Sequence, residues 1–370
     1  MKKIIITVVV IVAIVGAILV LESSKTREQV PQDVAMIGEN QNVVLPEESA
    51  PFIPSRVQDK EKQYQNYVEL VSPEGYINTE AITIGENIGK NIVLVDFWTY
   101  SCINCQRTLP YLNAWWEKYE ADGLVIIGVH TPEFAFEEEY ENVKRAVDKY
   151  GVEYPVVQDN DKQTWRAYKN RYWPHKYLID IDGFIVYDHI GEGGYEETEQ
   201  KIQELLRERN SVLKLNAVLE EGVTQPNASL PDFGQIGTPE IYFGYEFQRS
   251  QMGNTEGWKP EKLQTYALPS SLKDDLFYLE GDWFNHNDNM ELTGNQGKII
   301  IKYTAKNVNL VAGAAKPMTL TILKDGQLVN TMIVKDFDLY PLIQDETYGT
   351  HELTIELSEP GLMAYTFTFG

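Results

Sequence analysis

The sequence predicts an α/β domain with a mixed β-sheet, followed by an all-β domain and preceded by one membrane-spanning helix. Three observations predict this order. The N-terminal run is uniformly apolar, strands alternate with helices over residues 65–210, and short alternating stretches fill residues 238–370. At about 150 residues per domain, a chain of 370 residues has room for two or three domains.

The N-terminal apolar run covers residues 4–21. As a helix, these 18 residues would span about 27 Å, close to the thickness of a bilayer core. Two lysines precede the run, which favours an N-terminus held in the cytoplasm and export of the residues after the run. The run is longer than a signal-peptide core and lacks an Ala-x-Ala-like cleavage site, so residues 1–22 are expected to remain as a membrane anchor, or an uncleaved signal. We therefore expect a single-pass protein of the cell membrane whose bulk is extracytoplasmic.

Two polar segments separate the expected domains. Residues 23–64 carry scattered prolines and lack a sustained period, which predicts a flexible linker after the anchor. Residues 211–237 end in a stretch rich in Pro, Gly, Asn and Asp, which predicts a second linker. The α/β domain is therefore expected over residues 65–210 and the all-β domain over residues 238–370.

The α/β domain is indicated by strand and helix patterns in alternation. Residues 92–95 and 124–129 are short, largely apolar runs, as expected of strands buried on both faces of a sheet. Residues 177–181 and 184–190 flank Asp182-Gly183, a strong hairpin signal. Parallel strands followed by an antiparallel hairpin predict a mixed sheet. Helical stripes are formed by Leu109, Leu112, Trp116 and Tyr119, by Val143, Ala146, Val147 and Tyr150, and by Ile202, Leu205 and Leu206.

The all-β domain is indicated by a change of pattern after residue 238. Short stretches that alternate in hydropathy recur, and Lys324-Asp325-Gly326 provides a hairpin turn between two of them. Several short strands at this spacing predict a β-sandwich of the jelly-roll type. The stretches are residues 298–303, 318–323, 328–334, 352–357 and 364–369.

Composition limits the functions open to the chain. Lys and Arg number 32 against 55 Asp and Glu, a net charge of −23 at pH 7. Such a surface repels phosphate, which argues against nucleic acid or anionic lipid as partners. Two cysteines are too few for a disulfide scaffold, and five histidines add little towards a multi-metal site. A redox pair is the role left open to the two cysteines.

The most informative motif is Cys102-Ile103-Asn104-Cys105, which joins the end of a buried strand to the start of a helix. At a helix N-terminus, unpaired N–H groups and the helix dipole stabilise a thiolate, so Cys102 suits the role of nucleophile. Cys105 lies about one turn further in and suits the role of resolving thiol. We therefore expect a redox-active Cys102–Cys105 disulfide and no other cofactor.

Two other roles for the cysteines fit less well. A structural zinc site needs four ligands, and the sequence has no second cysteine pair, so we expect no metal. A static disulfide across two intervening residues closes a very short loop and therefore constrains the unfolded chain little.

With this motif in view, residues 65–210 resemble a thioredoxin-fold thiol–disulfide oxidoreductase of the TlpA/ResA kind, and in particular the thioredoxin-like region of DipZ-type proteins. Residues 238–370 resemble the β-sandwich that follows in DipZ-type proteins, which is itself similar to carbohydrate-binding modules. Those proteins often begin with a multi-span electron-transfer domain that this sequence lacks, so the resemblance implies a separate electron donor, expected to be a membrane thiol-transfer protein. The resemblance rests on Asp96-Phe97-Trp98, Cys102-x-x-Cys105, Pro110, Trp173-Pro174 and the strings at residues 128–134 and 191–195.

The resemblance also implies roles for residues near the cysteines. Asp96 matches the buried acid that carries a proton to and from the resolving cysteine, and the alternative is an aspartate that caps the following turn. Trp173-Pro174 falls where the family keeps a cis-proline loop facing the cysteines, whose backbone can pair with an extended substrate. We expect Trp173, Pro174, Trp98 and Ser101 to contact that substrate.

His130 and Glu133 come after the strand at residues 124–129. Parallel strands end at the same edge of a sheet, so both side chains are expected on the Cys102 side, where they would tune its pKa or contact substrate. A loop around Pro132 whose charges face water is an equally good interpretation.

Two further groups have structural interpretations that compete with functional ones. The run Glu137-Glu138-Glu139 suits the solvated start of a helix better than a metal site. Trp258 and Trp283 have the side chains that stack on sugars, but such aromatics more often fill the core of a sandwich.

Together these observations predict a membrane-anchored, extracytoplasmic thiol–disulfide oxidoreductase that acts on protein disulfides, with the reducing direction favoured. The β-sandwich would position the enzyme on a client protein or on cell-surface glycan. A thiol-dependent peroxidase is an alternative, because Thr99 stands three residues before Cys102, although Val95 stands where such loops carry proline. A second alternative is a non-catalytic glycan-binding or adhesion protein that uses the thioredoxin fold only as a scaffold.

Overall fold

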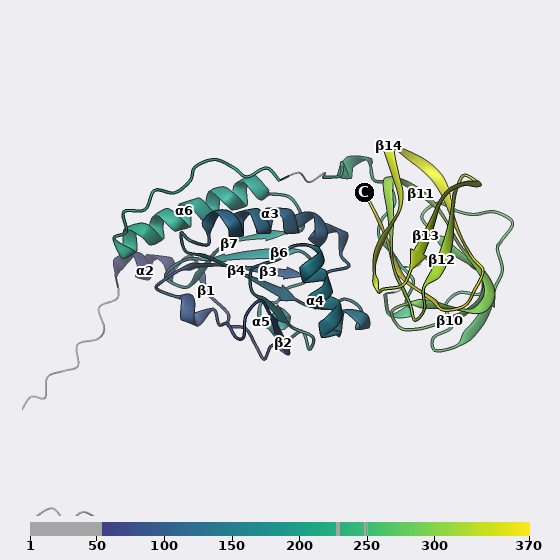
Figure 1. Ribbon diagram of the computed structural model, residues 1–370, viewed down its shortest axis with the longest axis horizontal. Coiled ribbons are helices and arrows are strands. Elements are labelled where there is room, and N and C mark those ends of the chain that lie inside the picture. Colours follow the sequence, from purple (N-terminus) through teal and green to yellow (C-terminus); the bar gives the residue numbers. More distant parts are fainter. Residues whose placement is uncertain (1–53, 227–229, 248, 250) are drawn as a thin grey trace, which may run out of the picture. The chain divides into compact units, whose positions relative to one another are not determined.

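The computed structural model describes residues 54–226, 230–247, 249 and 251–370 (Figure 1). These residues fall in one unit, Ile53–Gly370. The expected anchor, residues 1–22, and most of the expected linker lie outside the described residues. Within the range expected as linker, Ser55–Lys60 form helix α2. None of the helices in the described ranges is long and apolar enough to cross a membrane.

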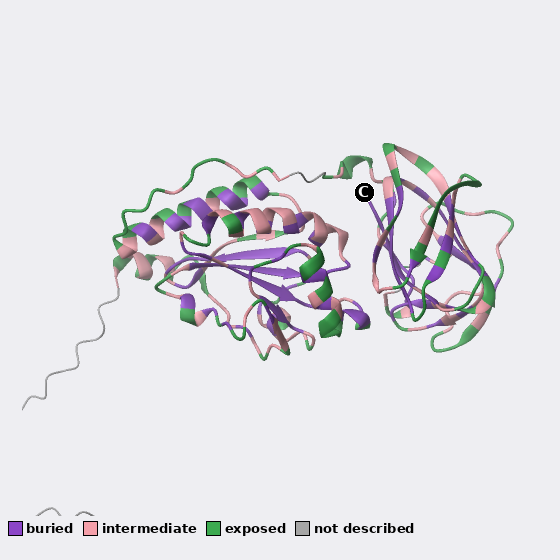
Figure 2. Ribbon diagram, in the orientation of Figure 1, coloured by how far each residue is buried: buried purple, intermediate pink, exposed green. Residues whose placement is uncertain are grey.

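The α/β domain is built on a sheet of seven described strands. In spatial order they are β1 (Gln65–Asn66), β7 (Phe184–Ile190), β6 (His175–Ile179), β3 (Ile92–Trp98), β4 (Leu124–His130), β5 (Val156–Gln158) and β2 (Gly75–Ile77). β3, β4 and β5 are parallel. β6 runs antiparallel to β3, and β7 antiparallel to β6, so the mixed sheet predicted from the sequence is confirmed. Every residue of the central strand β3 is buried (Figure 2).

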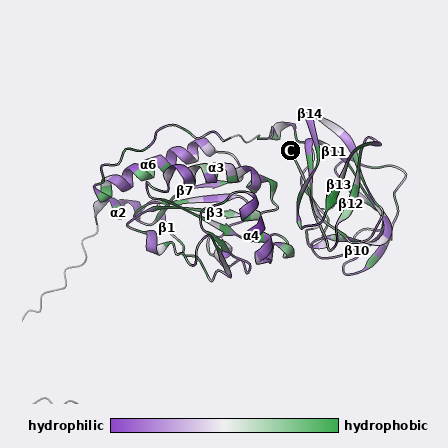
Figure 3. Cartoon of the chain, in the orientation of Figure 1, coloured by the Kyte–Doolittle hydropathy of each residue, from purple (hydrophilic) through white to green (hydrophobic). Residues whose placement is uncertain are grey.

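Two apolar cores form on the two faces of this sheet, because successive side chains of a strand point to opposite sides. The helices are α3 (Ile103–Tyr119), α4 (Tyr140–Lys149), α5 (Gln163–Ala167) and α6 (Tyr195–Leu213), with 3-10 turns η1 (Gly85–Asn87) and η2 (Ala135–Glu138). On one face, Leu94 and Trp98 pack with buried residues of α3, α4 and α6. On the other face, Phe97 packs with Tyr168 at the end of α5. Most of α6 is coloured as hydrophilic in Figure 3, which fits a helix that buries one side only.

The all-β domain contains eight strands in the part of the chain described. They are β8 (Ile241–Tyr242), β9 (Leu263–Tyr266), β10 (Phe277–Asn285), β11 (Met290–Ala314), β12 (Met318–Lys324), β13 (Gln327–Val334), β14 (Asp338–Leu357) and β15 (Leu362–Phe369), with 3-10 turns η3 (Phe233–Gln235) and η4 (Tyr245–Phe247). β11 pairs with β10, β14 and β15 at different points along its length, with shifts of register between them. A single hydrogen-bonded sheet therefore surrounds one apolar core. The five expected stretches fall within β11 to β15, whereas β8, β9 and β10 are additional.

Three details of the all-β domain test expectations from the sequence. Asp325 and Gly326 have φ angles of 52° and 74°, in the left-handed region that a tight hairpin turn requires, so the predicted turn is confirmed. Trp283 is fully buried in the core, and Trp258 packs against the same core with its Nε1–H donating to the Phe243 carbonyl at 2.8 Å. The core interpretation of both tryptophans is thus confirmed.

Aromatic side chains of the two domains pack against each other. Phe136 of η2 stacks on Phe337 with ring centres 5.2 Å apart and meets Tyr365 edge-on at 4.7 Å. The Tyr100 hydroxyl donates to the Phe337 carbonyl at 3.1 Å. The all-β domain therefore contacts the segment that leads into Cys102.

Candidate active site at the start of α3

Cys102 and Cys105 lie at the N-terminus of α3, where the motif predicts them. Cys102 is the N-cap residue, and its Sγ accepts a hydrogen bond from the Cys105 N–H at 3.4 Å. Cys102 is partly exposed, whereas Cys105 is 1% exposed. The first sulfur of the pair is thus the accessible one, which is the position that suits attack on a substrate.

Cys105 lies in the apolar core that also contains Leu94 and Trp98 of β3. Loss of solvation raises its pKa well above the ordinary value, and the hydrogen bond and charge of Cys102 raise it further. A thiol in this environment keeps its proton until a base removes it. The sequence contains a candidate for that base in Asp96.

Asp96 is buried within β3, 1% exposed among apolar neighbours. Loss of solvation raises its pKa to about 7, against the opposing charge of Lys176. Among the residues described, Asp96 Oδ1 has no hydrogen-bond partner. This is the arrangement of a buried acid and not of an aspartate whose side chain caps the following turn. Lys176 was missed by the sequence analysis, although a lysine directly before the strand expected at residues 177–181 is a signal that could have drawn attention to it.

The Trp173-Pro174 peptide bond is cis, which confirms the expectation drawn from the resemblance. The Trp173 carbonyl oxygen lies 4.0 Å from Cys102 Sγ. The Trp173 ring packs at a tilt against Trp165 with ring centres 4.2 Å apart, and its Nε1–H donates to the Thr131 carbonyl at 3.0 Å. The Trp173 backbone is therefore held beside the accessible sulfur, where an extended chain could pair with it.

Trp98 and Ser101, expected to contact substrate, are not accessible in this structure. Trp98 is 0% exposed and packs edge-on against His130 with ring centres 5.2 Å apart. Ser101 is 1% exposed, and its hydroxyl donates to Glu137 at 2.6 Å. That expectation is wrong for both residues, because one side chain fills the core and the other holds the loop in place.

Glu137 belongs to the site, although the sequence analysis placed it in solvent. It is 0% exposed, whereas its neighbours in the acidic run are exposed as expected. Its carboxylate accepts four hydrogen bonds, from the amide and hydroxyl of Ser101 and from the amides of Glu133 and Phe134. Glu137 thereby joins the loop before Cys102 to the loop after β4. No periodic pattern in the sequence distinguishes it from the acidic residues next to it.

We expect Glu137→Gln to lower the free energy of unfolding by about 2–4 kcal/mol, because an amide nitrogen would face N–H donors that then lack an acceptor. Urea denaturation of the two proteins at neutral pH measures the difference. Glu138→Gln, at the exposed next position, is the matched control and should leave stability unchanged. Two variants of equal stability would contradict this role of Glu137.

His130 is the last residue of β4 and is buried, whereas Glu133 lies in the loop after β4 and is half-buried. His130 is 0% exposed, with Nε2 3.4 Å from Thr99 Oγ1, so a solvent-facing loop is wrong for this residue. Burial lowers the pKa of His130 to about 3, so its ring is neutral at physiological pH. Glu133 accepts a hydrogen bond from the Tyr242 hydroxyl at 2.8 Å, and burial raises its pKa to about 8. That either residue tunes the pKa of Cys102 or contacts substrate stays a prediction.

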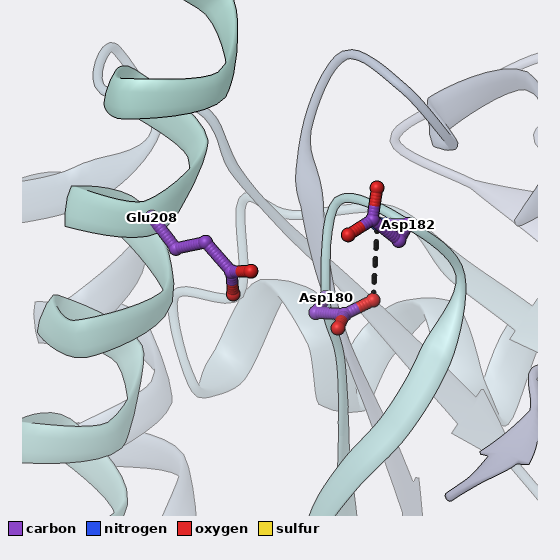
Figure 4. Close-up of side chains that lie close together, drawn as sticks. All are labelled: Asp180, Asp182 and Glu208. Atoms are coloured by element: carbon purple, nitrogen blue, oxygen red, sulfur yellow. Dashed lines mark hydrogen bonds between the residues drawn. The ribbon is translucent and has the colours of Figure 1, made fainter. Parts of the chain in front are cut away.

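The described residues hold one group of acidic side chains with metal-like spacing, formed by Asp180, Asp182 and Glu208 (Figure 4). Lys60 Nζ lies 2.6 Å from Asp180, 3.0 Å from Asp182 and 2.5 Å from Glu208. Arg56 pairs with Asp182 at 2.6 Å. The two cations of α2 therefore neutralise these three carboxylates. The ion pairs attach α2 to the domain, so the group is not a good metal site.

Two family models match parts of the chain. Residues 76–188 match the AhpC/TSA family, and residues 238–370 match a model described as a thioredoxin like C-terminal domain.

The curated proteins that are similar to the chain include the following three. Protein DipZ of Mycobacterium tuberculosis is 35% identical over 308 residues, which cover 82% of this chain and 42% of DipZ. Thiol-disulfide oxidoreductase ResA of Halalkalibacterium halodurans is 33% identical over 128 residues, 35% of this chain and 69% of ResA. Thiol-disulfide oxidoreductase YkuV of Bacillus subtilis is 27% identical over 147 residues, 40% of this chain and 98% of YkuV. The chain spans less than half the length of the DipZ protein that it matches.

Proposed function

Because the chain belongs to the thioredoxin-fold thiol–disulfide oxidoreductases of the ResA kind, we propose that it exchanges disulfides with protein substrates through Cys102 and Cys105. The asymmetry of the pair carries the proposal. One sulfur is partly exposed at a helix N-cap, 4.0 Å from the Trp173 carbonyl, and the other is buried behind it. The Cys102–Cys105 disulfide is the redox group, with no metal or organic cofactor.

The proposed reaction has two displacements. The Cys102 thiolate attacks one sulfur of a client disulfide, which forms a mixed disulfide and releases the other client sulfur as a thiolate. Cys105 then gives its proton to Asp96 and attacks Cys102 Sγ. The Cys102–Cys105 bond forms, the second client sulfur leaves, and the two electrons of the enzyme dithiol have passed to the client.

The environment of Cys105 favours the reducing direction. A strongly oxidising pair has a reduced form that is stabilised because its thiols ionise easily. Here burial and the charge of Asp96 raise the pKa of Cys105 instead. This makes the dithiol form of the pair a better donor of electrons.

The setting proposed for this reaction is the outer side of the cell membrane. Residues 1–22 would anchor the chain with its N-terminus in the cytoplasm, and the catalytic domain would act outside. Regeneration of the dithiol then requires electrons from a separate membrane thiol-transfer protein. The net charge of −23 makes nucleic acid a poor partner there.

The all-β domain is proposed to be a jelly-roll-like module of the carbohydrate-binding kind. It would hold the enzyme on a client protein or on cell-surface glycan. Its contacts with Tyr100 and Phe136 support this proposal, because both residues lie in segments near Cys102.

A thiol-dependent peroxidase is a second candidate, favoured by the match of residues 76–188 to the AhpC/TSA family. Thr99 is 0% exposed and contacts His130, so its hydroxyl is turned to the interior. This position does not favour a role for Thr99 in binding peroxide at Cys102, and the disulfide reaction is preferred.

The test is the redox equilibrium of the full chain in detergent, measured against glutathione and dithiothreitol. We expect one two-electron transition near that of thioredoxin, roughly −270 mV. A potential nearer to about −120 mV would overturn the reducing direction. A pair that does not titrate would overturn the catalytic proposal, and peroxide turnover as fast as disulfide reduction would favour the second candidate.

A further inference from the structure

Lys176 is a charged residue at a fully buried position of the fold. It lies on β6, two residues after the cis Pro174, and is 0% exposed. Burial of an ammonium group costs on the order of several kcal/mol, unless a partner charge offsets this cost. A lysine in this position therefore needs a nearby anion.

The register of the sheet supplies that anion. Lys176 pairs directly with Asp96 across the antiparallel strands β6 and β3. Directly paired residues point to the same face of a sheet, with Cβ atoms about 4.5–5.5 Å apart. On that face Leu94 and Leu178, each two positions from one of the pair, pack in the same core as Cys105. Asp96, Lys176 and Cys105 thus face the same buried region of the core.

Other polar groups around Lys176 are already engaged or neutral. Its Nζ donates to the Gly191 carbonyl at 3.2 Å and lies 5.7 Å from the centre of the Tyr195 ring. Glu192, the other carboxylate that acts on Lys176, is paired with Arg107 at 3.0 Å.

Three more titratable groups face the same region. His189 on β7 has a pKa lowered by burial and by the charge of Lys176, so it adds no positive charge. Tyr154, before β5, has a pKa raised well above its ordinary value by burial, so it adds no negative charge. Asp96 and Cys105 are the remaining groups able to carry the negative charge that balances Lys176.

We propose that Lys176 is a positioning residue for the second displacement, because its ammonium group keeps Asp96 able to receive the Cys105 proton when the mixed disulfide is resolved. This inference rests on the proposed roles of Cys102 and Cys105. Before the step this region of the core contains a thiol, a carboxylate and an ammonium group. After proton transfer it contains a thiolate, a carboxylic acid and the same ammonium group. The net charge is zero in both states, so no uncompensated charge is created in the core.

Without Lys176 the same proton transfer would leave one negative charge alone in the core. Asp96 would then keep its own proton to a higher pH and would be unable to receive another at neutral pH. The directions of the pKa shifts agree with this account, since Lys176 lowers the pKa of Asp96 and Asp96 raises that of Lys176.

The experiment mixes the reduced full chain with an aromatic disulfide whose thiolate product is coloured. The first coloured thiolate reports attack by Cys102, and the second reports resolution by Cys105. In Lys176→Met we expect the first phase to keep its rate, and the second to slow about tenfold at neutral pH with its midpoint about one pH unit or more higher.

Two comparisons separate this role from a loss of packing. Lys176→Arg keeps the charge and should restore the pH profile of the second phase. Asp96→Asn/Lys176→Met removes both charges. The pH profile of its second phase should therefore no longer show this midpoint. Lys176→Gln gives the same test as Lys176→Met if the methionine variant does not fold.

A second phase with the wild-type pH profile in Lys176→Met would overturn the inference. So would a first phase that slows as much as the second, because that result indicates general disruption of the site. A wild-type chain that releases no coloured thiolate would instead overturn the proposed function, so the two failures are distinguishable.

Discussion

Replacing Cys102 with serine is expected to slow disulfide exchange by at least about a thousandfold, because a serine hydroxyl is a far weaker nucleophile towards a disulfide than a cysteine sulfur. Replacing Cys105 with serine should have a different result. Cys102 remains accessible and still attacks, but nothing resolves the mixed disulfide, so Cys105→Ser should accumulate as a covalent adduct with the client.

Intact mass spectrometry of each variant, after incubation with a disulfide-containing peptide, measures both outcomes. The sequence has two cysteines, so an adduct on Cys105→Ser can form only at Cys102. Cys102→Ser is the matched control for the adduct, since its remaining sulfur is buried. An adduct on Cys102→Ser but not on Cys105→Ser would reverse the assigned roles.

The second large effect is expected from Asp96→Asn. Without the carboxylate, the Cys105 proton has no acceptor in the core, and resolution of the mixed disulfide should slow about tenfold to a hundredfold at neutral pH. The first displacement, made by Cys102, should keep its rate. Single-turnover kinetics with separate observation of the two released thiolates measures both steps, and equal slowing of both would contradict the assignment.

Asp96→Asn should also change how stability depends on pH. Burial raises the pKa of Asp96 from 3.8 to about 7, so between these values the folded state retains a proton that the unfolded state has released. This residue therefore lowers the stability of the wild type as pH rises through that window. The variant cannot titrate there, so the stability difference between the two proteins should shift in its favour by roughly 2–4 kcal/mol from about pH 4 to pH 7, and no further above it. This shift adds to a loss of stability at all these pH values, because the buried Lys176 no longer has its partner charge.

Urea denaturation across this pH range measures the difference between the two curves. Asp148→Asn on α4 is a suitable control, because that aspartate is exposed and should give a curve parallel to the wild type. A curve for Asp96→Asn that also runs parallel to the wild type would show that Asp96 titrates normally in the folded protein.

Much of the fold could be predicted because it depends on local patterns. The apolar runs at residues 92–95 and 124–129 became β3 and β4, and the Asp182-Gly183 turn lies between β6 and β7. The same reasoning was less complete in the all-β domain. β11 and β14 are long strands that change partners and register along their length. Alternating hydropathy predicts only those parts of a strand in which every second side chain faces the core.

The candidate site divides in the same way. Cys102 and Cys105 could be assigned from spacing, since four consecutive residues at a helix start place one sulfur outside and one inside. Trp98 and Ser101 were assigned to substrate because they adjoin the motif. Adjacency in sequence does not determine exposure, and both side chains are buried.

Residues near each other in the chain thus determined the order of elements, the mixed sheet and the pair of sulfurs, because helices, strands and turns depend on interactions over a few positions. Contacts between residues far apart in the chain decided the rest. Pairing of β3 with β6 brings Lys176 to Asp96, and the packing of η2 on the Cys102 loop turns Glu137 into a buried acceptor. No local pattern carries such contacts, because the cost of burying a charge is offset only by partners that the folded chain brings together.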